Sequence, residues 1–195
     1  MLRIYDRQGK SMIAQKYDGM YFPYPLTDQG IGEHLSEMRN MASREDDVLI
    51  TSYPKSGTHW LLEAVHMLMN NSVEYFRKDF PSPTGKSDGF PLLEYMLINK
   101  EIESLKPPRL MICHLKPKYI PQNFKGKIIH LTRNPKDVAV SYYTFIRKLK
   151  ILEYEGEWND FIPMFTKGDG MIFQICNTGS SIIIIIYHDN RRIKY

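Results

Sequence analysis

The chain has 195 residues, of which 43% are hydrophobic and 25% are charged, and its formal net charge is +4. This composition is typical of one globular domain and excludes a disordered chain, a collagen-like chain and a disulfide scaffold. The 26 basic and 22 acidic side chains are interspersed, without the long cationic stripe of nucleic-acid-binding proteins. We therefore expect a compact anionic ligand and no nucleic-acid partner.

The first ten residues carry four charged side chains and no apolar run long enough for a signal peptide. The two cysteines, Cys113 and Cys176, lie in apolar surroundings without metal-ligand spacing. We expect both to be free thiols in a reducing compartment, because no disulfide framework is visible in their spacing. Together these features predict a cytoplasmic protein.

Three continuous apolar runs predict buried strands, at residues 47–51, 109–114 and 127–132. Helical spacing and capping residues predict helices at residues 58–69, near 92–105 within a long loop, and from Asn134 to about Leu149. Apolar strands that alternate with helices are typical of a parallel sheet that is covered on both faces. The pattern therefore predicts an α/β domain.

Residues 170–195 show neither helical nor strand periodicity of the same quality. The five consecutive isoleucines at 182–186 have high β-propensity, and the apolar stretch around them is too interrupted for a membrane-spanning helix of about 20 residues. We expect no membrane span, and either an extra strand or a non-native terminus. If it were exposed, the isoleucine run would favour aggregation.

The strongest local signal is Thr-Ser-Tyr-Pro-Lys-Ser-Gly-Thr-His-Trp at residues 51–60, where a predicted strand turns directly into a predicted helix. Backbone N–H groups and the positive end of the helix dipole make such a turn an anion site. Lys55 adds a positive charge, and Gly57 allows close approach of the backbone. Lys55 precedes Gly57, whereas a Walker A lysine follows its second glycine, so ATP with magnesium is disfavoured. The alternative is a capped helix start beside a solvated lysine.

Further candidates follow the other two strands. Arg133-Asn-Pro-Lys-Asp137 ends the third strand, Ser141 lies one turn into the next helix, and His114 closes the second strand. We expect these side chains to face the same crevice as Lys55, because ligands bind outside the carboxyl ends of parallel strands. Arg133 could bind a phosphate through two hydrogen bonds. His114 has an intrinsic pKa suited to a general base. Taken singly, each residue has a commoner structural explanation.

These signals together resemble the cytosolic sulfotransferase family, which transfers a sulfuryl group from 3′-phosphoadenosine 5′-phosphosulfate (PAPS) to an alcohol, phenol or amine. Residues 53–60 are similar to the family's 5′-phosphosulfate loop, and residues 133–143 to its 3′-phosphate segment. The resemblance covers roughly residues 17–168. It implies a P-loop-like three-layer α/β fold with a central parallel sheet flanked by helices, incomplete at the C-terminus. We expect residues 1–168 to form this domain, and 169–195 a divergent tail of native or non-native origin.

The resemblance also implies roles for individual residues. Lys55 would stabilise the leaving group, His114 would take the acceptor's proton, and Ser141 would restrain Lys55. Trp60 would stack on adenine. The implied PAPS-binding residues are Lys55, Ser56, Gly57, Thr58, His59, Trp60, Arg133 and Ser141. The candidate walls of an apolar acceptor pocket are Phe22, Phe80, Phe90, Leu92, Tyr95, Tyr142 and Phe145. PAPS would be the co-substrate, and no metal would be needed because a sulfuryl group carries less charge than a phosphoryl group.

The sequence departs from the family pattern in two places. After residue 168 we would expect a Gly-Ser-Trp helix start, an Arg-Lys-Gly clamp and a short dimer-forming segment, and none follows; Ile112 stands where many members have lysine. We therefore expect weakened PAPS binding and no family-type dimer. Two functions stay open. One is a sulfotransferase, impaired in this chain, that acts on a small apolar phenol, steroid, other alcohol or amine. The other is an inactive pseudoenzyme that binds a nucleotide or a partner.

Overall fold

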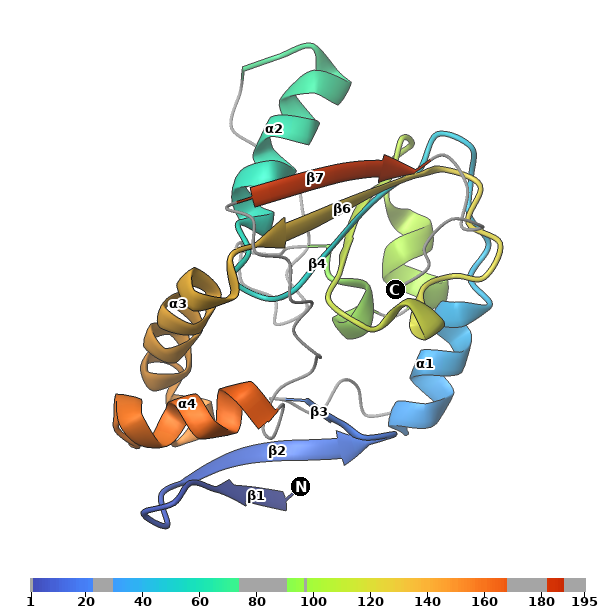
Figure 1. Cartoon of the computed structure of the whole chain (residues 1–195). Coiled ribbons are helices and arrows are strands. Elements are labelled where there is room, and N and C mark those ends of the chain that lie inside the picture. Colours follow the sequence, from blue (N-terminus) through green and yellow to red (C-terminus); the bar gives the residue numbers. More distant parts are fainter. Residues whose placement is uncertain (1, 23–29, 74–90, 97, 168–181, 188–195) are drawn as a thin grey trace.

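The computed structural model describes residues 2–22, 30–73, 91–96, 98–167 and 182–187 (Figure 1). Its centre is a four-stranded sheet with the order β5-β4-β6-β7. The strands are β4 (Val48–Ser52), β5 (Leu110–Cys113), β6 (Lys127–Arg133) and β7 (Ile182–Tyr187). β4 pairs in parallel with β5 and β6, whereas β7 pairs antiparallel with β6. The three predicted strands are confirmed, and the isoleucine run forms an extra strand.

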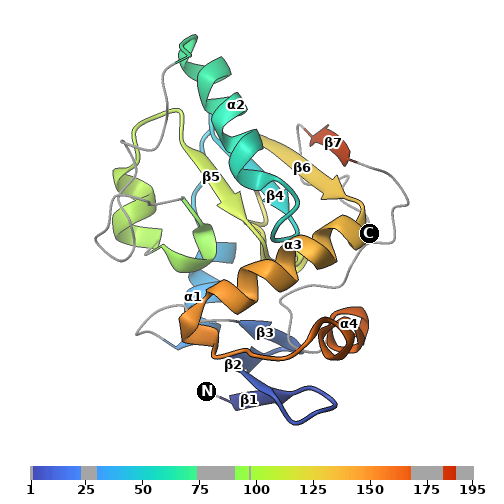
Figure 2. The same ribbon diagram turned by 90° about the vertical axis from the view of Figure 1, so that its left-hand side faces the viewer.

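Helices cover both faces of this sheet (Figures 1 and 2). On one face, α2 (Thr58–Asn70) packs through Leu62 against the side chain of Ile50. On the other face, α1 (Ile31–Arg39) buries Met38 in the same hydrophobic cluster as Leu49. Successive residues of β4 thus bury their side chains on opposite faces, which is why the strand is a continuous apolar run. The predicted α/β fold with a parallel sheet between helices is confirmed.

The predicted helix near residues 92–105 is confirmed only in part, because helical geometry covers residues 93–95 and 98–104 and is not continuous. The chain instead forms a short 3₁₀ helix, η2 (Leu93–Tyr95), and a single π-helical turn, η3 (Ile98–Ile102). Just before η2 the backbone is still extended, because Leu92 bridges Ile112 and the Ile112 N–H donates to the Pro91 carbonyl at 2.8 Å. A continuous helix is therefore replaced by a strand-like approach and two short turns. Further short 3₁₀ helices are η4 (Pro117–Tyr119) and η5 (Lys150–Leu152).

The predicted helix after β6 is α3 (Pro135–Lys148), which begins and ends within one residue of the expected bounds. Asn134 caps it, because its side-chain oxygen accepts a hydrogen bond from the Lys136 N–H at 3.0 Å. Pro135 occupies the first helical position, where its missing N–H costs nothing. The helix start was therefore readable from these residues.

A second, antiparallel sheet at the amino terminus was not predicted. It consists of β1 (Leu2–Tyr5), β2 (Ser11–Tyr17) and β3 (Met20–Phe22) in that order. Asp18 and Gly19 join β2 to β3 with φ angles of 48° and 71°, the pattern of a two-residue hairpin turn. Figure 2 shows this sheet below α3 and beside α4 (Trp158–Lys167). The sheet and the two helices share one hydrophobic cluster, which includes Met12 and Phe161.

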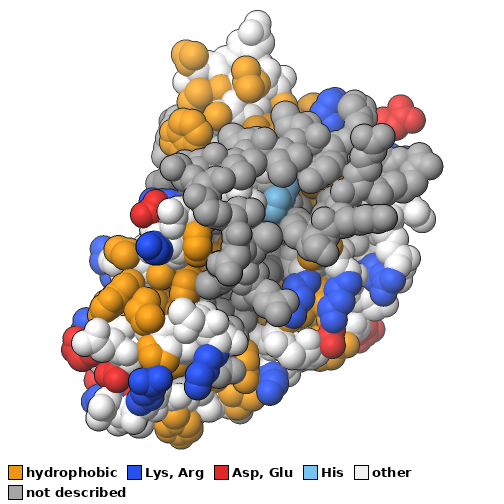
Figure 3. All heavy atoms as spheres, in the orientation of Figure 1, with side chains coloured by type: hydrophobic (Ala, Val, Ile, Leu, Met, Phe, Trp, Pro, Cys, Tyr) orange, Lys and Arg blue, Asp and Glu red, His pale blue; other side chains and the backbone are white. Residues whose placement is uncertain are grey.

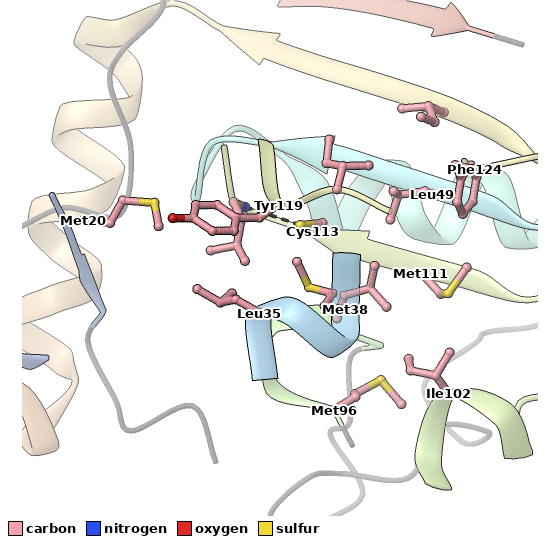
Figure 4. Close-up of a cluster of buried hydrophobic side chains, with 14 of the residues drawn as sticks. Met20, Leu35, Met38, Leu49, Met96, Ile102, Met111, Cys113, Tyr119 and Phe124 are labelled. Atoms are coloured by element: carbon pink, nitrogen blue, oxygen red, sulfur yellow. Dashed lines mark hydrogen bonds between the residues drawn. The ribbon is translucent and has the colours of Figure 1, made fainter. Parts of the chain in front are cut away.

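The largest hydrophobic cluster lies between the central sheet, α1 and the η2 region (Figure 4). Methionines contribute much of it, among them Met38, Met96 and Met111. Cys113 is buried in the same cluster as a free thiol, as predicted, whereas Cys176 lies outside the described residues. Within the described ranges, no helix is both long enough and apolar enough to cross a membrane.

A buried ion pair joins the amino ends of two central strands. Arg109, directly before β5, donates from Nε and Nη2 to the two carboxylate oxygens of Asp47 at 2.8 and 2.5 Å. The two residues are 2% and 0% exposed. Close by, the Lys127 N–H at the start of β6 donates to the Asp47 carbonyl at 2.8 Å, and a Cβ on Gly126 would collide with this carbonyl. This polar end of the sheet lies opposite the end where the candidate site forms.

Candidate functional site

The loop between β4 and α2 has the geometry of an anion site. It turns at Tyr53, whose carbonyl accepts the Ser56 N–H at 3.2 Å, and Lys55 and Gly57 both have left-handed φ angles, of 69° and 107°. Gly57 then precedes the first residue of α2. The Ser56 hydroxyl is buried and has no hydrogen-bond partner among the described residues. A buried hydroxyl is normally hydrogen-bonded, so a ligand oxygen or a water molecule at this loop would satisfy Ser56.

Lys55 and Arg133 converge on this loop from β4 and β6. The Arg133 guanidinium donates from Nη1 to the Lys55 carbonyl at 3.3 Å. The Lys55 ammonium lies over the ring of Phe145 on α3, 4.5 Å from its centroid. Burial lowers the pKa of Lys55, and the charge of Lys148 lowers it further. Ser141 is half-buried one turn before Phe145. Two cations therefore meet at the loop, and Arg133 also forms an ion pair with Asp137, in which Nε and Oδ2 are 3.8 Å apart.

His114 follows β5 and is held against the end of β4. Its Nδ1 lies 2.8 Å from the Ser52 carbonyl and 3.3 Å from the Ser52 hydroxyl, which in turn lies 2.6 Å from the Thr58 hydroxyl. Because a carbonyl oxygen can only accept, Nδ1 carries the proton and Nε2 is the basic nitrogen. Burial lowers the pKa of His114 to about 4, with smaller contributions from His59 and Lys55. The imidazole is therefore neutral near pH 7.

The structure thus brings most of the predicted ligand-binding residues to the same end of the parallel sheet. Ser52, His114 and Arg133 lie at or just beyond the carboxyl ends of β4, β5 and β6. His59 and Trp60 are exposed on the first turn of α2, with 74% of the Trp60 side chain accessible. Farther along this helix, apolar side chains gather at its protruding end, where Leu68 is exposed (Figure 3).

The candidate acceptor-pocket residues are more dispersed. Phe22 and Tyr142 are buried in two different hydrophobic clusters. The side chains of Leu92, Tyr95 and Phe145 are half-buried. Phe80 and Phe90 lie outside the described residues.

Two residues of the site were missed by sequence reasoning. Ser52 contacts His114, and it could have been found because it belongs to the same loop motif as Lys55. Glu94 accepts the His114 main-chain N–H at 3.0 Å, and its sequence signal is a single charge within the apolar run Pro-Leu-Leu-Glu-Tyr-Met. In the part of the chain that the structure describes, no group of three acidic, histidine or cysteine side chains could hold a metal ion.

Comparison with known proteins identifies the family. Residues 45–181 match the family model of the sulfotransferase domain. The chain is 34% identical to zebrafish (Danio rerio) sulfotransferase 6B1 over 142 residues, which are 70% of this chain and 46% of the relative. It is 35% identical to mouse (Mus musculus) sulfotransferase 1 family member D1 over 147 residues, or 71% of this chain and 48% of the relative. The chain therefore spans about half the length of these curated relatives.

A solved structure agrees with this result. The crystal structure of mouse sulfotransferase SULT7A1 complexed with PAP superimposes with a TM-score of 0.61 and 29% sequence identity, covering 82% of this chain and 53% of that one. The family model covers the loop between β4 and α2 and the strand ends that carry His114 and Arg133. The fold, the site and the sequence matches therefore converge: this chain belongs to the sulfotransferase family.

Proposed function

We propose that this chain binds PAPS and transfers its sulfuryl group to a hydroxyl or amine of a small apolar acceptor. The observation that carries the proposal is the buried Ser56 hydroxyl, which has no partner among the described residues and lies in a loop that meets the start of a helix. A phosphate at this point would accept from Ser56 and from the first N–H groups of α2. The mouse structure complexed with PAP supports this choice of nucleotide.

The two cations at the loop suit the ends of such a nucleotide. Lys55 supplies positive charge where the phosphosulfate would lie, so it would stabilise the bridging oxygen as charge develops there. Arg133, which already contacts the Lys55 carbonyl, would bind the 3′-phosphate together with Ser141. The exposed indole of Trp60 is available to stack on the adenine.

His114 would act as the general base. In the proposed step the acceptor oxygen forms a bond to sulfur while the bond between sulfur and the bridging oxygen breaks. The leaving group is PAP (adenosine 3′,5′-bisphosphate), the nucleotide without its sulfuryl group, and it carries away the negative charge. The acceptor's proton moves to Nε2 of His114. Because the Ser52 carbonyl holds the proton on Nδ1, the lone pair that can accept is fixed on Nε2. The depressed pKa keeps His114 unprotonated, and therefore able to accept, throughout the neutral range.

The acceptor would contact the half-buried apolar side chains beside the base. Leu92 and Tyr95 are half-buried and flank Glu94, whose carboxylate contacts the His114 main chain. Phe145 presents its ring to the Lys55 ammonium. An apolar wall next to a charged transfer site favours a phenol, a steroid or a similar alcohol over a charged acceptor.

Two measurements on the purified chain test the proposal. Calorimetric titration should show PAP binding that Ser56→Ala weakens by roughly tenfold, the scale of one hydrogen bond to a charged group, whereas Ser104→Ala, which removes an exposed hydroxyl away from the loop, should have no effect. Transfer of labelled sulfate from PAPS to a simple phenol should be abolished by His114→Ala and Lys55→Ala. PAP binding without any transfer would favour the inactive nucleotide-binding alternative. Failure to bind PAP at millimolar concentration would refute the proposal.

A further inference from the structure

A chain of polar contacts, buried at its two ends and half-buried at His114, links α1 to the loop between β4 and α2. His34 on α1 contacts the Glu94 carbonyl through Nε2 at 3.1 Å, and the Glu94 carboxylate accepts the His114 N–H at 3.0 Å. The His114 ring then contacts the Ser52 carbonyl, and the Ser52 hydroxyl contacts Thr58 at the start of α2. Glu94 is the middle of this chain, and the proposed transfer step gives it no role.

Glu94 is an ionisable group in an apolar environment. It is 1% exposed, and its neighbours Leu93 and Met96 belong to the large hydrophobic cluster, together with Cys113 (Figure 4). One carboxylate oxygen accepts the His114 N–H, and the carboxyl also makes a side-chain hydrogen bond with the Cys113 thiol. Burial raises the pKa of Glu94 to about 7. An apolar side chain at this position would leave the His114 main-chain N–H without its acceptor.

The ionisable groups that face Glu94 come from two elements. His34 approaches from α1 and has a pKa lowered by burial, so it is neutral near pH 7. Cys113 and His114 approach from the end of β5, and burial also keeps the Cys113 thiol protonated by raising its pKa. The carboxyl of Glu94 is therefore the group in this cluster that changes charge near neutrality.

We propose that Glu94 is a positioning residue for His114. Its carboxylate fixes the main-chain N–H of His114, and this contact holds the imidazole against the Ser52 carbonyl with the proton on Nδ1. The ionised carboxylate makes the stronger hydrogen bond, because charge-assisted hydrogen bonds exceed neutral ones. The expected effect of Glu94 on kcat rests on the proposed function, whereas its effect on the His114 amide and ring does not.

The position of Glu94 gives this contact a second effect. Leu92 and Tyr95 lie on either side of it in the same short segment, and Leu92 is bridged to Ile112 in β5. The segment that carries two proposed acceptor contacts is thus joined to the strand that carries the base. Glu94 would keep the distance between the acceptor and His114 constant.

The primary test uses nuclear magnetic resonance and needs no activity. In the wild-type chain the His114 amide resonance should titrate with a midpoint near pH 7, and the His114 ring should be a single Nδ1-protonated tautomer. Glu94→Gln keeps an accepting oxygen but cannot ionise, so the amide titration should disappear while the tautomer remains. The matched control is Glu103→Gln, because Glu103 is an exposed carboxylate of the same region. This control should behave as the wild type.

A kinetic test follows if the chain transfers sulfate. Glu94→Gln should abolish the change in kcat that accompanies ionisation near pH 7, and Glu94→Ala should lower kcat at least tenfold, with PAP affinity changed less than twofold. A His114 amide that does not titrate near pH 7 in the wild type, or that titrates unchanged in Glu94→Gln, would overturn the proposal. If Glu94→Ala does not fold, the titration of the His114 amide in Glu94→Gln still tests the proposal. Absence of PAP binding and of transfer would instead refute the proposed function, and the amide titration would remain a separate result.

Discussion

Removal of Asp47 should destabilise the protein more than removal of any exposed charge. In Asp47→Ala the Arg109 guanidinium keeps its hydrogen bond to the Ala42 carbonyl at 3.0 Å but loses both bonds to the carboxylate. The Arg44 N–H also loses its acceptor at 2.8 Å. A buried charge left without its partner costs about 3–5 kcal/mol. For a protein of this size the expected fall in Tm is roughly 6–20 °C.

Urea and thermal unfolding followed by circular dichroism would measure this loss. The matched control is Arg3→Ala, because Arg3 forms an ion pair with Glu153 at 2.7 Å in which both side chains are about half exposed. Exposed pairs contribute about 0–1 kcal/mol. The double variant Asp47→Ala, Arg109→Met removes the unpaired charge and should recover at least half of the loss. A loss in Asp47→Ala no larger than in Arg3→Ala would refute the argument.

Three further predictions concern single residues. The pKa of His114 in the folded protein lies near 4, below its ordinary value. Between about pH 6.5 and 4 the unfolded chain therefore binds more protons than the folded one. His114 should make the free energy of unfolding fall as the pH drops through this window. His114→Gln should flatten that part of the pH dependence in urea titrations, and an unchanged slope would contradict the assignment. Gly126→Ala should lose about 1–3 kcal/mol in the same assay, because its Cβ would collide with the Asp47 carbonyl; an unaffected midpoint would mean that the loop shifts freely. Asn134→Ala should lose about 1 kcal/mol by removing the cap on α3, and Asn134→Asp should restore it.

The central sheet could be predicted because its signals are local. Residues of β4 such as Leu49 and Ile50 are buried on opposite faces, and this arrangement appears in the sequence as an unbroken apolar run. The cap at Asn134 and the turn through Gly57 are likewise encoded within a few residues. Since parallel strands end at one edge, topology places Lys55 and Arg133 at the same end of the sheet, where Arg133 donates to the Lys55 carbonyl.

Other features depend on contacts between distant segments. The amino-terminal sheet has short strands, and only the Asp18-Gly19 pair marked a hairpin. The helix expected near residues 92–105 does not begin at Leu92, because Leu92 pairs with Ile112 of β5 and this pairing outweighs local helical propensity. The burial of Glu94 beside His114 joins positions 20 residues apart, and no periodicity in the sequence encodes it.

The helix α3 has two working faces. Through Phe145 it sits over the Lys55 ammonium, while Tyr142 and Ile146 are buried in the cluster that also contains Met12 of β2. The amino-terminal sheet therefore supports α3 and sets its distance from the loop. Substitutions in β2, although remote from the loop, should change the tilt of the Phe145 ring against the Lys55 ammonium.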